Sequence, residues 1–505
     1  MNLAMNLVTT ARGKPDSPAL RVGYVTLNYQ DFLAKARAAA GFLADRGVRP
    51  GDRIALILPN VPSFPILFYG VLFAGAAVVP MNPLLTEREI GYYFTDAGVK
   101  VAFAFEALPD GGAAANAAGA ALGVEVVVVG PLGLSEEQYQ EQGQVPDAPA
   151  HRDDDDLAVL LYTSGTTGQP KGAELTHNNL ATNALVTADS LLQTGNGDVV
   201  MGCLPLFHVF GLTCGLNTSV LTGSCLALLP RFDPVKALEL IGQQRVTVFQ
   251  GVPTMYSALL HTPGLENYDT SSLRLCVSGG AAMPVEVLHS FEQRFDAIIL
   301  EGYGLSETSP VVSFNHPDAV RKPGSIGTPI DGVQVRIVDD TGAPVAPGEV
   351  GELAVRGHGV MRGYWQRPEA TAEAIPDGWF RTGDLGRADE DGYLYIVDRK
   401  KQLIIRGGYN VYPREIEEVL HEHPAVAEVA VVGLKHATLG EEVGAAVSLV
   451  PGATASAAEL RAFAKERVAA YKYPRHVWLV DALPKGPTGK ILHREVVPPP
   501  DVVVE

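Results

Sequence analysis

The chain has 505 residues, of which 39 are Lys or Arg and 57 are Asp or Glu, giving a formal net charge of −18. Hydrophobic residues make up 47% and charged residues 19%, which excludes a disordered chain and allows several buried cores. The acidic balance excludes general binding to nucleic acid or to an anionic membrane surface, because both require a positive patch. Four cysteines without a Cys-x-x-Cys pair, and a start without a signal-peptide pattern, indicate reduced thiols in a soluble, cytoplasmic protein.

Helix and strand patterns alternate through the N-terminal part of the chain. Apolar residues at Phe32, Ala36 and Ala39 recur at helical spacing, and residues 53–58 are typical of a buried strand. The apolar stretch 66–79 is shorter than the ~20 residues that cross a bilayer, so we expect a core helix there. Further strand patterns lie at 77–80, 101–104, 124–129 and 246–249. The alternation predicts an α/β fold with mostly parallel sheets in a large N-terminal domain of several subdomains.

The composition changes at two segments that are predicted to lack regular secondary structure and at one domain boundary. Small residues crowd 111–119, and prolines followed by acids occupy 146–156, so both segments are predicted to be irregular. Near Asp398 a segment with its own pattern begins. We expect a large domain over 1–397 and a small α+β domain over 398–505. In the small domain the pattern predicts helices over 416–420 and 457–469 and strands over 426–432 and 445–450.

A strand at 160–162 runs into a loop that combines glycines, hydroxyls and one lysine. The loop reads Thr163-Ser164-Gly165-Thr166-Thr167-Gly168-Gln169-Pro170-Lys171-Gly172, and we expect a helix to begin near Thr176. Glycines let backbone N–H groups approach phosphate oxygens, hydroxyls add donors, and Lys171 adds positive charge. The spacing is not that of a Walker A motif, because Pro170 stands where that motif needs its second glycine. The loop is therefore predicted to bind phosphate without the P-loop of common kinases and ATPases.

This loop resembles the signature of the adenylate-forming superfamily, which includes acyl-CoA synthetases, aryl-CoA ligases, luciferases and peptide-synthetase adenylation domains. Further segments resemble the family's motifs in the family's order, at 204–210, 302–308, 324–329, 379–384, 398–401, 407–413 and 484–491. Each segment is weak alone, but their shared order identifies the chain as a member, most similar to medium- or long-chain fatty acyl-CoA ligases. The resemblance implies that Mg·ATP activates a carboxylate as an acyl-adenylate with release of pyrophosphate, before the acyl group passes to a thiol.

The resemblance assigns most motif residues to ATP. Glu307 would hold Mg²⁺ with Thr163 as a second contact, since this cation prefers oxygen donors. Asp384 would accept hydrogen bonds from the ribose hydroxyls, and Arg399 would approach the same ribose. Tyr303 would stack on adenine. The other ATP- or AMP-binding residues implied by the resemblance are Ser164, Gly165, Thr166, Thr167, Gly168, Lys171, Gly280, Ala281, Ala282, Gly302, Gly304 and Ser306.

The resemblance also assigns residues to a small domain that moves. Lys490 would be the catalytic residue of the first step, because its ammonium can neutralise charge between the attacking carboxylate and the α-phosphate. Asp398 would be the hinge about which the small domain rotates between the two half-reactions. In the second position Lys490 would leave, and Gly408 with Tyr409 would line the tunnel for coenzyme A. ATP, Mg²⁺ and coenzyme A are therefore the expected cofactors.

The acyl group is predicted to be uncharged and apolar. His208 is matched to the segment that borders the acyl pocket in relatives, and we expect it to orient or gate the carboxylate as a second catalytic residue. The pocket is expected to include His208, Val209, Phe210, Gly279 and Gly280. No acid lies in 207–212 to pair an amino group, and no Lys or Arg lies in 207–212 or 277–284 to pair a second carboxylate. These absences favour a fatty acid as substrate.

Alternatives remain for the acid, the acceptor and the class of protein. The chain stops soon after Lys490 without a carrier domain, so free coenzyme A is the expected acceptor and a separate carrier protein the alternative. A coumarate- or benzoate-like aryl-CoA ligase, or a luciferase-like oxidation, stays open. A non-catalytic nucleotide-binding protein is disfavoured because Lys490, Glu307 and Asp384 are all present. Residues 398–505 hold 14 Lys or Arg and 14 Asp or Glu, so residues 1–397 carry the whole −18, and we expect ATP and coenzyme A to meet cations of the small domain at a cleft.

Overall fold

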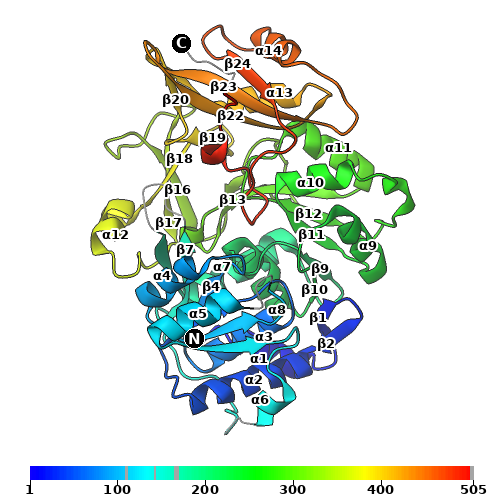
Figure 1. Ribbon diagram of the computed structural model, residues 1–505, viewed down its shortest axis with the longest axis vertical. Helices are drawn as coiled ribbons and strands as arrows, with labels where there is room; N and C mark the ends of the chain where they lie inside the picture. The colour runs from blue at the N-terminus through cyan, green and yellow to red at the C-terminus, as the bar shows by residue number, and fades with distance from the viewer. Residues whose placement is uncertain (109–111, 141–143, 164–169, 501–505) are drawn as a thin grey trace.

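The computed structural model describes residues 1–108, 112–140, 144–163 and 170–500. Figure 1 shows the N-terminal and central parts of the chain as the larger body, with the C-terminal sheet and its helices placed over one end of it. The mixed α/β class that the sequence predicts is confirmed. The boundary at residue 398 stays a prediction.

The first sheet is covered by helices on both faces. Its strands, in sheet order, are β6 (Glu125–Val129), β5 (Val99–Phe105), β3 (Arg53–Ile57), β4 (Ala77–Met81), β7 (Leu157–Thr163) and β8 (Lys171–Thr176), parallel except for the β7–β8 pair. Ile54 and Leu56 pack in the cluster that contains helices α2 (Tyr29–Asp45) and α3 (Ser63–Phe73). Ala55 and Ile57 pack with α4 (Glu87–Ala97) and α5 (Ala113–Leu122) on the opposite face, because side chains alternate along a strand.

The second sheet is parallel from β13 to β1 and antiparallel at both ends. Its order is β15 (Thr328–Pro329), β14 (Val311–Phe314), β13 (Ile298–Gly304), β12 (Leu275–Ser278), β11 (Val248–Gly251), β9 (Val199–Gly202), β10 (Cys225–Leu228), β1 (Pro18–Val22) and β2 (Val25–Asn28). Helices α10 (Pro253–Leu260) and α11 (Val285–Phe295) pack together through Tyr256 and Phe291, whose rings meet edge to face. The π-helix η2 (Gly211–Asn217) contacts β9.

Other helices of this part are α1 (Met5–Gly13), α6 (Glu136–Gln140), α7 (His177–Val186), η1 (Thr187–Leu192), α8 (Thr218–Thr222), α9 (Pro234–Gln244), η3 (Leu265–Asn267) and η4 (Ser306–Thr308). Helix α7 begins after Thr176, whose hydroxyl accepts a hydrogen bond from the backbone N–H of Asn179. The helix start expected near Thr176 is therefore confirmed.

An antiparallel sheet follows. Its strands are β16 (Val333–Val338), β17 (Gly351–Gly357), β18 (Phe380–Ala388) and β19 (Leu394–Arg399), with α12 (Pro368–Ala374) and η5 (Pro376–Gly378) between β17 and β18. Asp384 on β18 lies opposite Arg399 on β19 in the register. Both residues are therefore held by backbone pairing.

The C-terminal part has its own sheet and core. Its strands are β21 (Tyr409–Val411), β20 (Ile404–Arg406), β23 (Gly440–Leu449), β22 (Val426–His436) and β24 (His476–Leu479), with helices α13 (Pro413–His421), α14 (Ala457–Lys465) and η6 (His493–Glu495). Ile416, Leu420 and Leu460 pack with strand residues in one buried cluster. The helices and strands expected in this segment are confirmed, with shifted ends.

One expectation about local structure is wrong, one helix is shorter than expected, and one strand was not expected. The segment expected to be irregular at 111–119 forms most of α5, because alanine has the highest helix propensity and Ala115 and Ala118 pack against the first sheet. The core helix expected within 66–79 is confirmed as α3 but ends at Phe73, since Gly75, at φ +77°, follows the helix, and the strand expected at 77–80 is confirmed as β4. Strand β8, which lies between the glycine-rich loop and α7, was not predicted.

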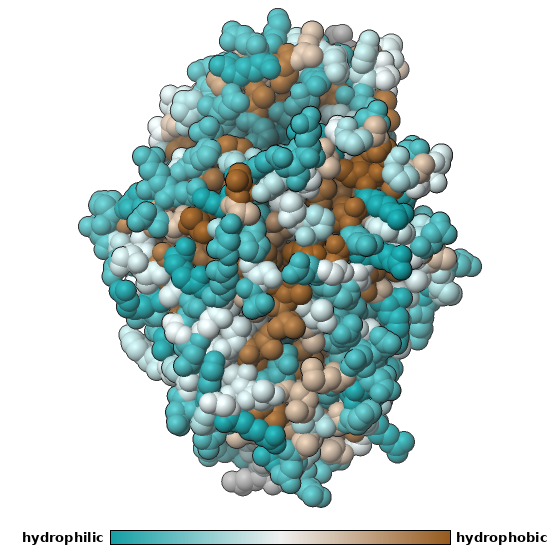
Figure 2. All heavy atoms as spheres, turned by 180° about the vertical axis from the view of Figure 1, so that it is seen from behind, coloured by the Kyte–Doolittle hydropathy of each residue, from teal (hydrophilic) through white to brown (hydrophobic). Residues whose placement is uncertain are grey.

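The surface combines polar residues with scattered apolar ones. Figure 2 shows polar residues over most of the back face and apolar residues gathered in a central band. In the described part of the chain, no helix combines the length and apolar character that a membrane span requires. Cys203, Cys214, Cys225 and Cys276 lie buried as free thiols, as expected.

Candidate active site

A cavity of about 860 Å³ lies beyond the carboxyl ends of the parallel strands of the second sheet, and β18 and the C-terminal loop also border it. An adjoining cavity of about 230 Å³ extends between the second sheet and helix α13. The predicted residues that line the larger cavity are Thr163, Lys171, His208, Val209, Phe210, Gly279, Gly280, Gly302, Tyr303, Gly304, Ser306, Glu307, Asp384, Arg399 and Lys490. Ala281, Ala282 and Asp398 line the smaller one. The fold thus brings together residues that are far apart in the sequence.

Strands β7 and β8 hold the two ends of the glycine-rich loop side by side. Thr163 and Lys171 are partners in the antiparallel register. The Lys171 ammonium lies over the ring of Tyr364, 5.1 Å from its centroid. Residues Ser164, Gly165, Thr166, Thr167 and Gly168 lie outside the described residues. The loop therefore starts and ends at the cavity, with one cation at its end.

Glu307 presents a carboxylate beside hydroxyl groups. Its Oε1 accepts hydrogen bonds from the Tyr364 hydroxyl at 2.9 Å and the Thr163 hydroxyl at 3.4 Å. Burial raises the pKa of Glu307, and these hydrogen bonds oppose the rise. The carboxylate and the Thr163 hydroxyl are hard oxygen donors, so this pair fits Mg²⁺ held by one carboxylate and by substrate phosphates. Among the described residues, no group of three or more His, Cys, Asp or Glu is placed to hold a metal.

Asp384, Tyr303 and Arg399 form a second polar group that lines the same cavity. The Tyr303 hydroxyl donates to Asp384 Oδ2, and Arg399 Nε lies 3.0 Å from Asp384 Oδ1. Asp384 is 3% exposed. The backbone of Gly302 is pressed against Phe314, since a Cβ there would lie 2.0 Å from the phenyl ring. The group offers a fixed carboxylate next to an aromatic ring, which suits a ribose joined to a flat base.

Lys490 reaches the same cavity from the C-terminal part. Its loop is a tight turn in which Gly486 N–H donates to the Lys490 carbonyl at 2.8 Å. Burial lowers the pKa of Lys490 to about 8, with the charge of Arg399 acting in the same direction and that of Asp384 opposing it. The side chain is thus an ammonium near neutral pH, and it lies close enough to the buried Asp384 carboxylate to feel its charge.

His208 lies on the apolar side of the cavity, before η2. Its Nδ1 accepts a hydrogen bond from the Phe210 N–H at 3.3 Å. Burial lowers the pKa of His208 to about 4, and the nearby charge of Lys490 acts in the same direction, so the ring is neutral near pH 7. A Cβ on Gly279 would lie 3.1 Å from the Phe210 ring. The aromatic ring and the glycine therefore pack closely and form a wall of the cavity.

Comparisons with known proteins show the family to which the chain belongs. The sequence pattern of the family described as "AMP-binding enzyme" matches residues 7–365, and that of "AMP-binding enzyme C-terminal domain" matches residues 415–490. The chain belongs to the AMP-binding enzyme family. It is an adenylate-forming ligase of the acyl- and aryl-CoA ligase class, and its membership of the adenylate-forming superfamily is confirmed.

Relatives of this AMP-binding enzyme act on more than one kind of acid. A long-chain-fatty-acid–CoA ligase of Bacillus subtilis (strain 168) is 41% identical over 521 residues, covering 97% of this chain and 93% of that protein. A feruloyl-CoA synthase of Amycolatopsis sp is 38% identical over 492 residues, covering 97% of each. ATP-bound MatB from Rhodopseudomonas palustris has a TM-score of 0.89 at 36% identity, covering 97% of each chain. A benzoate CoA ligase from Burkholderia xenovorans LB400 has a TM-score of 0.91 at 32% identity, covering 98% of this chain and 99% of that one.

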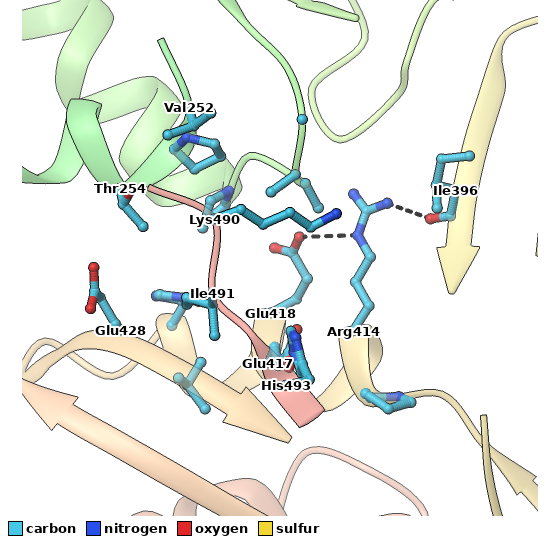
Figure 3. A pocket seen from close by; sticks show the side chains of 18 of the residues that line it. Val252, Thr254, Ile396, Arg414, Glu417, Glu418, Glu428, Lys490, Ile491 and His493 are labelled. Atoms are coloured by element: carbon cyan, nitrogen blue, oxygen red, sulfur yellow. Dashed lines mark hydrogen bonds and ion pairs between the residues drawn. The ribbon is translucent and has the colours of Figure 1, made fainter. Parts of the chain in front are cut away.

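In this AMP-binding enzyme Asp398 lies near the end of β19 and contacts the start of α13. Its carboxylate accepts hydrogen bonds from the backbone N–H groups of Arg399 at 2.7 Å and Arg414 at 3.3 Å. Burial raises the pKa of Asp398 to about 6, and these N–H groups oppose the rise. The Arg414 guanidinium donates to the Ile396 carbonyl and lies 3.7 Å from Glu418 (Figure 3). Hydrogen bonds from Arg414 to Asp398 and to Ile396 therefore connect α13 to β19.

Two predicted residues lie away from both cavities. Gly408, at φ +85°, has open space where a Cβ would lie. Tyr409 is 59% exposed and its ring stacks on Tyr471, with centroids 4.8 Å apart. In this arrangement Lys490, and not the Gly408 turn, lines the larger cavity.

Sequence reasoning missed Tyr364, which touches both Glu307 and Lys171. Tyr364 precedes the motif at 379–384 and belongs to none of the motifs that carry the resemblance. Its neighbour Trp365 is bonded through its backbone N–H to the Gly172 carbonyl at 2.8 Å. The contact depends on pairing between distant segments, so no local pattern could have indicated it.

Proposed function

We propose that this enzyme converts an apolar carboxylic acid, ATP and coenzyme A into an acyl-CoA, AMP and pyrophosphate, and that the preferred acids are medium- or long-chain fatty acids. The observation that carries the proposal is the placement of Lys490 in one cavity with the buried carboxylates of Asp384 and Glu307 and with the apolar wall beside His208. The first half-reaction, which forms the acyl-adenylate, requires a positive charge between the nucleotide and the acid, and the Lys490 ammonium supplies it.

In that half-reaction a carboxylate oxygen of the acid attacks the α-phosphorus of ATP, and the bond from this phosphorus to the β-phosphate bridging oxygen breaks. Negative charge increases between the two reactants, and the Lys490 ammonium offsets it. Asp384 holds the ribose and Tyr303 lies against the base. Glu307 and Thr163 would hold Mg²⁺, which supplies charge to the phosphates.

The second half-reaction places the thiol of coenzyme A on the carbonyl carbon of the acyl-adenylate and releases AMP. We propose that rotation about Asp398 takes Lys490 out of the cavity and brings the Gly408 turn to it. The open space around Gly408 supports this role, since a glycine there leaves room for a narrow chain such as pantetheine.

The apolar side supports a fatty acid. Neutral His208 offers a hydrogen bond without a charge, and Val209, Phe210 and Gly279 add walls without ionisable groups. Each CH₂ buried there stabilises binding by ~0.8 kcal/mol, so affinity would rise with chain length. The relative that acts on long-chain fatty acids agrees with this reading.

An aryl acid is the second candidate. The Phe210 ring packs at the position of Gly279, which makes one wall of the cavity flat and aromatic. A flat wall stacks well on an aromatic ring. The feruloyl-CoA synthase and benzoate CoA ligase relatives agree with this alternative.

The test is a panel of acids from acetate to palmitate, with ferulate and benzoate, incubated with the enzyme, ATP and Mg²⁺ with and without coenzyme A. We expect pyrophosphate release that increases with acyl length and yields a thioester when coenzyme A is present. Preference for ferulate or benzoate would favour the aryl candidate. Pyrophosphate release without thioester would favour a separate carrier protein as acceptor, and release that no acid stimulates would contradict the proposal.

A further inference from the structure

Thr254 joins the larger part of the enzyme to the loop that carries Lys490. It lies in the first turn of α10, directly after Pro253. Its hydroxyl donates a hydrogen bond to the Gly489 carbonyl, with 2.9 Å between the oxygens. Gly489 is bonded directly to Lys490 along the chain, so this hydrogen bond acts one peptide away from the catalytic lysine.

The loop is packed closely at this contact. Gly489 has φ +82°, and a Cβ there would lie 3.2 Å from Val252 Cγ2 and 3.3 Å from the Thr254 hydroxyl oxygen. Figure 3 shows Val252 and Thr254 on the α10 side beside the C-terminal loop from which Lys490 extends. The turn is closed within itself by hydrogen bonds from Gly489 N–H to the Gly486 carbonyl and from Gly486 N–H to the Lys490 carbonyl. A contact that holds one point of such a turn therefore holds the turn as a unit.

The hydroxyl of Thr254 is not used to stabilise its own helix. Thr262, which follows the same helix, donates from its hydroxyl to the Ala258 carbonyl at 2.9 Å, as threonines near helices often do. Thr254 instead donates across to a segment 235 residues away. The two threonines can therefore be compared directly. Thr254 makes a contact with the C-terminal part of the enzyme, and Thr262 makes a local contact.

We propose that Thr254 is a positioning residue that docks the Lys490 loop for adenylate formation and has no role in thioester formation. This proposal rests on the proposed function, in which Lys490 acts in the first half-reaction and leaves in the second. The contact between Thr254 and Gly489 must then break and re-form once in every turnover. One hydrogen bond suits that task, because it favours the docked position without making release slow.

The experiment compares Thr254→Val, which keeps the shape and removes the hydroxyl, with Thr254→Ser, which keeps the hydroxyl. Thr262→Val, just after the end of the same helix, is the matched control. For each variant we would measure acid-dependent ATP–pyrophosphate exchange, thioester formation from supplied acyl-adenylate, and the rate of trypsin cleavage after Lys490 in the presence of Mg·ATP. The melting temperature of each variant confirms that it is folded.

We expect Thr254→Val to lower the kcat of exchange about fivefold to tenfold, the effect of one lost hydrogen bond, with the KM for ATP unchanged. Thioester formation from supplied adenylate should stay at the wild-type rate, and cleavage after Lys490 should become faster. Thr254→Ser should restore exchange, and Thr262→Val should resemble the wild type in all three measurements.

Three results would overturn the proposal. The first is an unchanged kcat of exchange and an unchanged cleavage rate in Thr254→Val. The second is an equal loss of both half-reactions, which would indicate a general structural role. The third is a raised KM for ATP at unchanged kcat, which would indicate a contact with nucleotide. A wild-type enzyme that shows no exchange with any acid would contradict the proposed function instead, and the cleavage rates would still test the docking contact.

Discussion

The two sides of the main cavity differ in how they are built. On the nucleotide side, Asp384 is held by the Tyr303 hydroxyl and by Arg399, and Glu307 by two further hydroxyls. On the acyl side, Phe210 and Gly279 meet by packing, and His208 is neutral. Hydrogen bonds and ion pairs demand particular side chains, whereas packing accepts many combinations of similar volume. Under the proposed function, the first side would set the chemistry of the reaction and the second the choice of acid.

The largest effect is expected where the two sides meet, at Lys490. Lys490→Ala should lower the rate of adenylate formation by about 10²- to 10³-fold, because charge between the acid and the α-phosphate is no longer offset. Thioester formation from supplied acyl-adenylate should be retained. Pyrophosphate release and thioester assays measure the two steps separately, with Lys435→Ala, an exposed lysine of the same part, as the control. Equal loss of both steps would contradict the division of labour.

The reverse result is expected at Gly408. Gly408→Leu should abolish thioester formation, because its side chain would fill the open space that we propose for coenzyme A. Adenylate formation should stay unchanged, because this space lies away from the proposed nucleotide site. The same two assays measure it. The substituted residue would also be strained at φ +85°, so the melting temperature is measured alongside. An active thioester step in a folded Gly408→Leu variant would exclude this turn from the coenzyme A path.

On the nucleotide side, Asp384→Asn should lower kcat/KM for ATP by about ten- to a hundredfold, since the amide cannot accept every hydrogen bond that the carboxylate accepts. The dependence on acid chain length should stay as in the wild type. Asp391→Asn, at an exposed carboxylate paired with Lys322, is the control. A changed acid preference in Asp384→Asn would contradict the view that different residues determine nucleotide binding and the choice of acid.

On the acyl side, Gly279→Ala should change the dependence on the acid and leave the dependence on ATP unchanged. Its methyl group would press on the Phe210 ring at 3.1 Å, so the KM for long acids should rise about tenfold while the KM for ATP stays the same. Gly91→Ala, where a Cβ meets open space, is the control. If the substitution left the preference between long and short acids unchanged, the acyl chain would have to bind elsewhere.

The smallest effect concerns pH. Lys490 must be an ammonium to offset charge, and its pKa is lowered to about 8, so the rate of adenylate formation should fall as pH rises through about 8. His208, with a pKa of about 4, stays neutral from pH 6 upward and should add no change there. Thioester formation should lack this fall. A pH profile of each half-reaction measures the difference, and a fall common to both would assign the titration to another group.

Residues that line both sides of the cavity, including His208, Phe210 and Gly279, could be predicted from the sequence, whereas the contacts between distant segments could not. Lys490, Asp384 and Glu307 stand in short motifs that resemble those of the adenylate-forming superfamily, and this resemblance indicated them. Tyr364 and Thr254 act through contacts with segments far away in the chain, and their neighbours carry no pattern.

The same contrast applies to the fold. The alternation of strand and helix patterns predicted the parallel sheets, because it depends on local periodicity. Helix α5 was missed because small residues suggest a loose chain, although alanines that pack on a sheet form a helix readily. Strand β8 was missed because its pairing with β7 spans the glycine-rich loop.

The most direct test of the central claim is a single-turnover experiment with the wild-type enzyme, Mg·ATP labelled at the α-phosphate, and palmitate, to which coenzyme A is added after a delay. The account predicts that labelled acyl-adenylate accumulates on the enzyme together with pyrophosphate, and that coenzyme A then converts it to palmitoyl-CoA and labelled AMP. Formation of ADP, or of thioester without any preceding adenylate, would contradict it.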